Sequence, residues 1–222
     1  LIAIHPNIRT VLKLALGRFV PDENYTAFVA ENESWLADYA VFMALKDENA
    51  GNPWLNWEEA LKNHDADALE EKRQTLQETV QLHYFLQYVF DRQWKALRSY
   101  ANDKGIRIIG DVPIYVPLDS ADVWAEPELF QLDENRRPEV VAGCPPDAFT
   151  ADGQLWGNPI YDWQKMHETG YDWWIRRLKA AEKLYDVVRI DHFRGFDEYF
   201  SIPADKASAK YGHWEKGPGM DL

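Results

Sequence analysis

The chain has 222 residues, and its 37 Asp and Glu outnumber its 24 Lys and Arg, which gives a formal net charge of −13. This acidity argues against nucleic acid or a membrane surface as a partner, because both attract clustered positive charge. No apolar run approaches the length of a transmembrane helix. Cys144 is the single cysteine, so no internal disulfide can form and we expect a cytoplasmic protein.

Two long helices are predicted in the first half of the chain. From Asn24 to Lys46, apolar residues recur at three- and four-residue spacing, and Gly51 and Pro53 end the pattern. A second helical run extends from about Ala68 to Asp103, followed by Gly105 as a left-handed C-terminal cap. We therefore expect residues 1–103 to form a helical unit.

The second half of the chain has the pattern of alternating helices and strands. Short β-branched runs at 106–111 and 187–191 each end in an aspartate, and a predicted helix at 171–184 precedes the second run. This alternation predicts an α/β fold. In a β/α barrel, the carboxyl ends of the strands face the active site. We therefore expect residues 104–222 to carry barrel strands with a site at Asp111 and Asp191.

A long stretch, residues 112–161, separates these two strands. It contains seven of the chain's prolines and shows little periodicity, and ordered loops of this length are usually functional. Its aromatic side chains are therefore candidates for a binding surface. They are Tyr115, Trp124, Phe130, Phe149, Trp156 and Tyr161.

The second strand end suggests a specific chemistry. Side chains alternate along a strand, so Arg189 and Asp191 point to the same side. A guanidinium beside a carboxylate lowers the pKa of that carboxyl group and keeps it ionised. An ionised carboxylate is what a retaining glycosidase uses as its nucleophile. A buried structural ion pair would have the same spacing, so spacing alone leaves both interpretations open.

Four sequence segments together resemble one enzyme family. They are RIDHFRG (189–195), GDVPIYV (110–116), DSADVW (119–124), and VAGCPPD (141–147) continued by GQLWGNP (153–159) and YDW (161–163). Taken in chain order, they are similar to the amylomaltases, which are the 4-α-glucanotransferases of glycoside hydrolase family 77, called disproportionating enzymes in plants. The resemblance runs from about Ala27 to the end of the chain. It implies an α/β fold that is part of a (β/α)8 TIM barrel with helical and long-loop insertions, and a chain that is a central fragment of such an enzyme. In that fragment, residues 1–103 would supply a helical insertion and barrel helices, and residues 104–222 would supply barrel strands with a long substrate-loop insertion.

The resemblance also implies roles for individual residues. Asp191 would be the nucleophile, Arg189 would hold it ionised and oriented, and Asp111 would bind a hydroxyl of the donor sugar. The other substrate-binding candidates all belong to the loop that would line the glucan groove. They are Asp147, Phe149, Gln154, Trp156 and Asn158.

Several of these residues have plainer interpretations that stay open. Asp111 could be a turn-forming carboxylate, and Trp156 could only pack the loop. His192 alternates away from Asp191, so a supporting role fits it better than acid or base catalysis. Cys144, beside two prolines, is interpreted as a small packed side chain.

The function that these expectations imply is transfer of α-1,4-glucan segments between maltodextrin donors and acceptors by a retaining double displacement. We expect no cofactor and no metal, because no His or Cys has metal-site spacing and no glycine-rich phosphate loop follows a strand. The family's acid/base Glu lies downstream of the nucleophile, so we expect this fragment alone to be inactive. We also expect self-association through exposed strand edges. The alternatives are an α-amylase-like glucan hydrolase, a non-catalytic glucan-binding fragment and an inert folded fragment.

Overall fold

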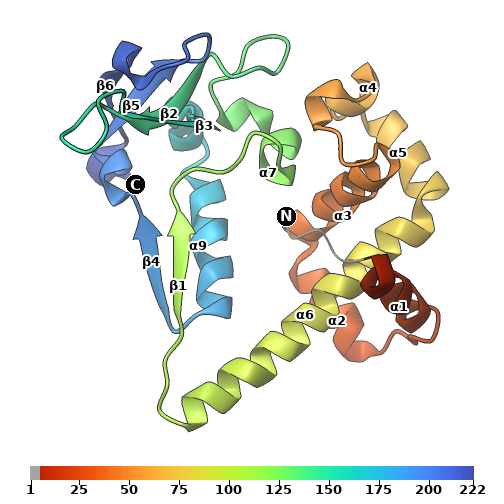
Figure 1. Ribbon diagram of the computed structural model, residues 1–222. Coiled ribbons are helices and arrows are strands. Elements are labelled where there is room, and N and C mark those ends of the chain that lie inside the picture. Colours follow the sequence, from red (N-terminus) through yellow and green to blue (C-terminus); the bar gives the residue numbers. More distant parts are fainter. Residues whose placement is uncertain (1–5) are drawn as a thin grey trace. The chain divides into compact units, whose positions relative to one another are not determined.

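The computed structural model describes residues 6–222, with side chains from Ile8 onward. The chain divides into two compact units, Leu1–Ser99 and Tyr100–Leu222. Figure 1 shows the first as helices and the second as strands with helices around them. The predicted assignment of 1–103 as an insertion with barrel helices and of 104–222 as barrel strands stays a proposal.

The first unit consists of helices joined by short turns. Its helices are α1 (Pro6–Leu16), α2 (Glu23–Glu31), α3 (Glu33–Glu48), α4 (Glu59–Lys62), α5 (Ala66–Thr75), the first part of α6 (Gln77–Asp103), and the 3-10 turn η1 (Trp54–Asn56). Two long helices were predicted here, and both predictions were wrong about continuity. The first breaks at Asn32, whose side chain donates to the Phe28 carbonyl and accepts from the Trp35 indole, competing with the helix hydrogen bonds. The second breaks at Leu76, where the sequence carries no local breaker.

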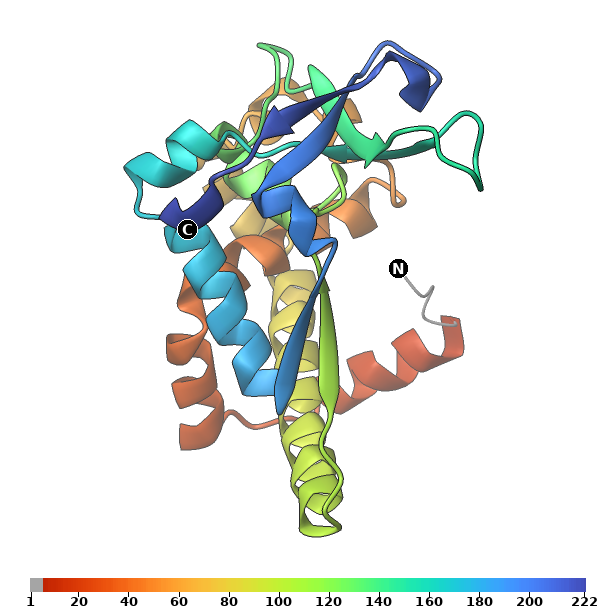
Figure 2. The same ribbon diagram turned by 90° about the vertical axis from the view of Figure 1, so that its left-hand side faces the viewer.

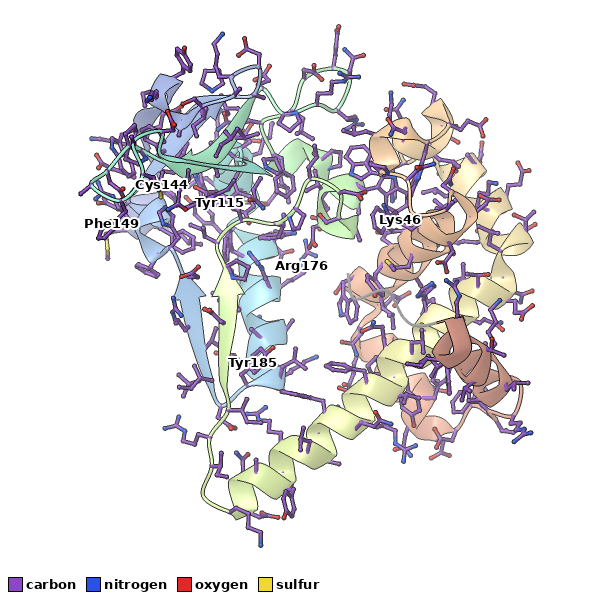
Figure 3. The ribbon with its side chains drawn as sticks, in the orientation of Figure 1. Lys46, Tyr115, Cys144, Phe149, Arg176 and Tyr185 are labelled. Carbon is purple, nitrogen blue, oxygen red and sulfur yellow. The ribbon has the colours of Figure 1, made fainter. Side chains whose placement is uncertain are left out.

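Aromatic packing and buried charge hold the first unit together. Phe28, Leu36 and Tyr88 form a buried cluster on α2, α3 and α6. Lys46 on α3, labelled in Figure 3, is buried, and its ammonium donates to the carbonyls of Gly51 and Asn52 at 2.8 and 3.0 Å. These bonds satisfy the charged group inside the fold, which is the condition for burying it.

The second unit contains a parallel pair of strands, β1 (Ile109–Pro113) and β4 (Val187–Asp191). The prediction for β4 is confirmed, whereas β1 begins three residues later and ends two residues later than expected. Helix α9 (Asp172–Leu184), also confirmed, contacts both strands. A Cβ on Gly110 would lie 2.0 Å from the ring of Tyr185, which Figure 3 places at the base of the pair, so only glycine fits there.

A second sheet was not foreseen in the sequence. Its strands are β2 (Val140–Cys144), β3 (Gln154–Pro159), β5 (Glu198–Pro203) and β6 (His213–Lys216), antiparallel in the order β3-β2-β5-β6. Figures 1 and 2 show β1 and β4 pointing toward this sheet. The prediction that 112–161 is irregular is therefore wrong in part. Its strands are short and interrupted by Gly and Pro, which hides the two-residue alternation.

Short helical segments connect these strands or follow the last of them. They are α7 (Ala121–Ala125), η2 (Pro127–Leu129), α8 (Trp163–Glu168), η3 (Phe193–Phe196), η4 (Ala209–Tyr211) and η5 (Gly219–Asp221).

The structure corrects the interpretation of most loop aromatics as a binding surface. Tyr115, Trp124, Phe130 and Tyr161 are buried, and the rings of Tyr115 and Phe130 pack against that of Tyr161. They belong to the core because β2, β3 and the turn after β1 need an apolar filling between them. Of the six aromatics, only Phe149 and Trp156 remain at the surface of the described residues.

Candidate active site

Three charged side chains meet on one face of the parallel pair. The Arg189 guanidinium donates to Asp191 at 2.7 Å and to Asp111 at 3.3 Å. The register pairs Asp111 with Arg189 and Pro113 with Asp191, so alternation puts all three side chains on the same face. We call them the charged triplet.

The charged triplet lies open at the surface of the described residues. The side chains of Arg189, Asp111 and Asp191 are 61, 56 and 54 % exposed. A buried structural ion pair, one of the two interpretations left open by the spacing, is therefore not what the described residues form. Exposed ion pairs of this kind add little to stability, whereas an open carboxylate held by one guanidinium is accessible to a ligand.

The turn that follows β1 is fixed by side chains from three other elements. The carbonyl of Ile114 accepts from the Tyr161 hydroxyl at 2.5 Å and from Arg177 on α9 at 3.2 Å. The side chain of Asn158 on β3 donates to the carbonyl of Val116 at 2.9 Å. These bonds anchor the chain just after Asp111, so the position of that carboxylate depends on α9 and β3 as well as on its own strand.

His192 follows the charged triplet in a left-handed backbone conformation, with φ of 56° and ψ of 43°. Its ring meets the indole of Trp156 on β3 edge to face, with ring centroids 4.9 Å apart at 89°. Burial lowers the pKa of His192, an effect that Arg194 reinforces and Asp191 opposes. The ring is therefore neutral near neutral pH.

The other predicted binding residues lie in the loop between β2 and β3, which carries Asp147 and Phe149, and on β3 itself, which begins at Gln154. Asp147 accepts from the backbone N–H groups of Phe149 and Thr150 at 2.8 and 2.7 Å, and these bonds lower its pKa. Phe149 is 95 % exposed, and Figure 3 shows it on the outside of this loop. Gln154 accepts from the Trp156 indole at 3.0 Å.

The structure thus places the predicted residues in two groups. The charged triplet and Trp156, through His192, lie together at the carboxyl end of β4. Asp147 and Asn158 make turn and anchoring bonds within the chain, so a direct contact with a sugar stays a prediction for both. Phe149, which is almost fully exposed, belongs to neither group.

Sequence reasoning missed Arg177, which stacks on Trp173 and Trp174 at 5.3 and 5.0 Å and reaches the Ile114 carbonyl. A usable signal was present: an arginine three and four residues after paired tryptophans on a predicted helix lies on the same face as both. Nothing in the sequence indicated the left-handed conformation of His192.

The described residues 6–222 lack two features that would suggest other kinds of site. No group of three or more His, Cys, Asp or Glu side chains there could hold a metal ion. Across the same residues, every helix falls short of the length and apolar character needed to cross a bilayer.

Comparison with known proteins gives one consistent family. A sequence model of glycoside hydrolase family 77, described as 4-alpha-glucanotransferase, matches residues 6–222. A 4-alpha-glucanotransferase of Streptococcus pneumoniae is 48 % identical over 218 residues, which are 96 % of this chain and 43 % of that protein. The 4-alpha-glucanotransferase of Thermus thermophilus is 51 % identical over 200 residues, 90 % of this chain and 40 % of that protein.

A solved structure is similar over nearly the whole chain. The amylomaltase of Streptococcus agalactiae in complex with acarbose superimposes with a TM-score of 0.93 at 44 % identity, covering 99 % of this chain and 45 % of that one. The expected fold class, α/β as part of a barrel, is confirmed by this match. The chain spans less than half the length of the curated relatives described above.

Proposed function

The chain belongs to the 4-alpha-glucanotransferase family, and from this premise we propose that the whole protein moves α-1,4-glucan segments from a maltodextrin donor to an acceptor. The observation that carries the proposal is the charged triplet, in which one guanidinium lies between two open carboxylates on one face of the parallel pair, with Asp191 at the carboxyl end of β4. In barrel enzymes, this end of the strands holds the reacting groups.

In the first step, a carboxylate oxygen of Asp191 attacks the anomeric carbon of the donor sugar. The glycosidic C–O bond breaks, and its oxygen takes a proton from the general acid, which the family resemblance assigns to a Glu beyond this chain. In the second step, the 4-hydroxyl of the acceptor attacks the covalent glycosyl ester and gives its proton to the same Glu. Asp191 leaves as a carboxylate, and two inversions at the anomeric carbon give net retention.

The remaining site residues support these steps. Arg189 donates to Asp191 at 2.7 Å, and this charge-assisted hydrogen bond holds the carboxylate in a fixed orientation. Asp111, 3.3 Å from the same guanidinium, would accept hydrogen bonds from hydroxyls of the donor sugar. The exposed rings of Trp156 and Phe149 offer flat apolar surfaces to the faces of sugar rings.

The proposal is tested by incubating the intact protein with maltotriose and following products by chromatography. A transferase yields glucose together with maltopentaose and longer chains, whereas a hydrolase yields glucose and maltose without elongation. Retention of configuration should be visible by NMR of the first product. Absence of any chain redistribution, with Asp191→Asn as the blank, would overturn the proposal.

We further propose that the 222-residue chain alone is inactive. The charged triplet is more than half exposed in it, and a groove that excludes water is required if transfer is to outcompete hydrolysis. The same assay on the isolated chain checks this, since redistribution at a rate near that of the intact protein would contradict it. Self-association through the strand edges of β1 and β4 also stays a prediction, which light scattering on the isolated chain can test.

The proposal also includes substrate source and location. Starch- or glycogen-derived maltodextrins are the expected donors, and plants contain similar proteins, such as the chloroplastic/amyloplastic 4-alpha-glucanotransferase of Solanum tuberosum. A cytoplasmic location is proposed on the single cysteine, Cys144, whose thiol pKa is raised by burial.

A further inference from the structure

We propose that Arg177 on α9 is a positioning residue of the transfer reaction: its guanidinium fixes the peptide between Ile114 and Tyr115, and this peptide holds the Asp111 carboxylate in place for the donor sugar. This role rests on the proposed function, because Asp111 is the proposed sugar ligand. Arg177 acts through the Ile114 carbonyl, which accepts a hydrogen bond from it at 3.2 Å and lies three residues after Asp111. Tyr115 lies just beyond the end of β1 (Figure 3).

The carbonyl of Ile114 lies where the parallel ladder ends. The register of β1 with β4 runs to Pro113, and the carbonyl of the next residue is bonded by two side chains. The Tyr161 hydroxyl donates to it at 2.5 Å and Arg177 donates at 3.2 Å, so both acceptor positions of this oxygen are used. A Cβ on Gly195 would lie 2.7 Å from the Ile114 side chain. Packing therefore fixes that side chain, and the two donors fix the direction of the carbonyl.

Arg177 is held by aromatic faces. Its guanidinium carbon lies 5.3 and 5.0 Å from the ring centres of Trp173 and Trp174, whose planes are nearly perpendicular at 85°. Cation–π contacts of this kind stabilise a guanidinium that is partly withdrawn from water. Within the described part of the chain, its hydrogen-bond acceptors are the Ile114 carbonyl and the Tyr161 hydroxyl, the latter at 3.4 Å. The charged donor is therefore directed to the turn after β1.

Arg176, the preceding residue of α9, is used differently. It forms ion pairs with Glu126 and Asp172 at 2.8 and 2.7 Å. The side chains of Arg176 and Glu126 are 32 and 33 % exposed, and partly exposed pairs contribute little to stability. The hydrogen bonds of Arg176 go to these two carboxylates. The two neighbouring arginines therefore provide a test residue and a matched control on one helix.

The anchored carbonyl is coupled to Asp111 through a short and stiff piece of backbone. Only Val112 and Pro113 separate Asp111 from Ile114. Proline locks its own φ and restricts the residue before it, so few soft dihedral angles lie between the anchor and the carboxylate. The hydrogen bond from Arg189 to Asp111, at 3.3 Å, is longer than most such bonds. The position of Asp111 therefore depends mainly on its backbone.

The test uses the intact protein with three variants. Arg177→Met removes the donors and keeps an unbranched apolar side chain against the indoles, Arg177→Lys keeps a cationic donor, and Arg176→Met is the control. We expect Arg177→Met to lower kcat with maltotriose on the order of 10- to 100-fold, because small misplacements at a reacting centre have effects of this size. KM should change less, since hydrogen bonds to sugar hydroxyls strengthen in the transition state.

The remaining variants decide whether the donor is responsible. Arg177→Lys should recover part of the loss, and Arg176→Met should match the unmodified protein. Unchanged kcat in Arg177→Met would overturn the proposal, and so would equal losses in Arg177→Met and Arg177→Lys. Circular dichroism shows whether each variant is folded.

A double-mutant cycle separates positioning of Asp111 from other roles. If Arg177 acts through Asp111, adding Arg177→Met to Asp111→Asn causes little further loss. Independent, multiplicative losses would overturn the proposal. Should Arg177→Met fail to fold, Arg177→Lys takes its place in the cycle with the same expectation.

A readout without activity keeps this role distinct from the proposed function. In protein with 13C-labelled aspartate carboxyl groups, the resonance of residue 111 is assigned by its absence in Asp111→Asn. We expect that resonance to shift or broaden in Arg177→Met and to stay unchanged in Arg176→Met. An unperturbed resonance in Arg177→Met would overturn the positioning role even in an active enzyme. A perturbed resonance in a protein that redistributes no maltotriose would uphold the positioning of Asp111 and refute the proposed function alone.

Discussion

Each unit of the molecule contains a three-membered cluster of charged and polar side chains, and the two are built in opposite ways. In the helical unit, Asp47 accepts from Arg9 and lies 3.1 Å from the ring of His83, so one carboxylate has two partners. In the charged triplet, one guanidinium is shared by two carboxylates. Asp47 is 23 % exposed, whereas each member of the triplet is more than half exposed.

The difference teaches what each cluster is suited to do. The carboxylate of Asp47 is fully compensated and largely shielded, so its bonds tie α1 to α3 and α6. One guanidinium cannot neutralise two carboxylates, so the triplet retains a negative charge and free acceptor oxygens at an open surface. The first arrangement serves folding, and the second leaves a carboxylate available for a substrate.

The largest effect should come from removing the nucleophile. Asp191→Asn in the intact protein should lower kcat on the order of 10⁴- to 10⁶-fold, because the neutral amide cannot form the covalent ester. Its free energy of unfolding, measured by thermal denaturation, should stay within about 1 kcal/mol of that of the unmodified protein, since exposed ion pairs contribute little. If the variant lost more free energy of unfolding than transition-state stabilisation, the charged triplet would serve folding and not the reaction, which would contradict the contrast between the two clusters.

The opposite pattern is expected for the helical cluster. Asp47→Asn should destabilise the first unit by about 2–3 kcal/mol, because two partly buried partners lose their acceptor charge. Hydrogen exchange of amides in α3 and α6 of the intact protein measures this. Glu48→Gln, which removes an exposed pair with Lys72, is the control and should cost under about 1 kcal/mol. Equal protection in both variants would contradict the assignment.

The pH dependence of the first unit sharpens the same contrast. Burial alone would raise the pKa of Asp47, but hydrogen bonds with His83 and Arg9 outweigh it and lower the pKa to about 2. Since the unfolded value is near 4, the unfolded state binds more protons between these pH values. The stabilisation of about 2 kcal/mol is fully present above about pH 4 and is lost as pH falls toward 2. Acid titration monitored by circular dichroism should show this loss, and Asp47→Asn should lack it.

The smallest effect is expected at the exposed loop. Phe149→Ala should raise KM for long maltodextrins about 2- to 5-fold and leave kcat unchanged, because an exposed ring contributes binding area without touching the bond that breaks. Steady-state kinetics with maltotriose and maltoheptaose measures this. A change in kcat would instead show that Phe149 acts together with the charged triplet, and would contradict this prediction.

The elements around the charged triplet could be predicted because their signals are local. The β-branched run at 187–191 predicted β4, and the helical pattern before it predicted α9. The two-residue alternation of a strand then put Arg189 and Asp191 on one face. Parallel pairing then brought in Asp111 from 78 residues away in the sequence. These inferences needed only alternation and the rule for strand ends.

The parts that could not be predicted depend on contacts distant in sequence. The four-stranded sheet draws strands from both sides of β4, and Leu76 breaks a helix without any helix-breaking chemistry. The left-handed turn at His192 and the burial of Tyr161 are set by packing, which overrides local preference. The aromatic residues of 112–161 were misinterpreted because a buried ring and an exposed ring are identical in a sequence.

The contact between Gly110 and Tyr185 has a consequence for anyone redesigning this protein. The ring of Tyr185 fills the volume that a side chain at position 110 of β1 would need. The packing on this face of β1 therefore determines the position of the Asp111 side chain on the opposite face. In the proposed transferase, substitutions in the helix-facing layer would therefore change how Asp111 is presented to a donor sugar, although neither substituted residue is proposed to contact the sugar. Libraries aimed at specificity should vary positions 110 and 185 as a pair.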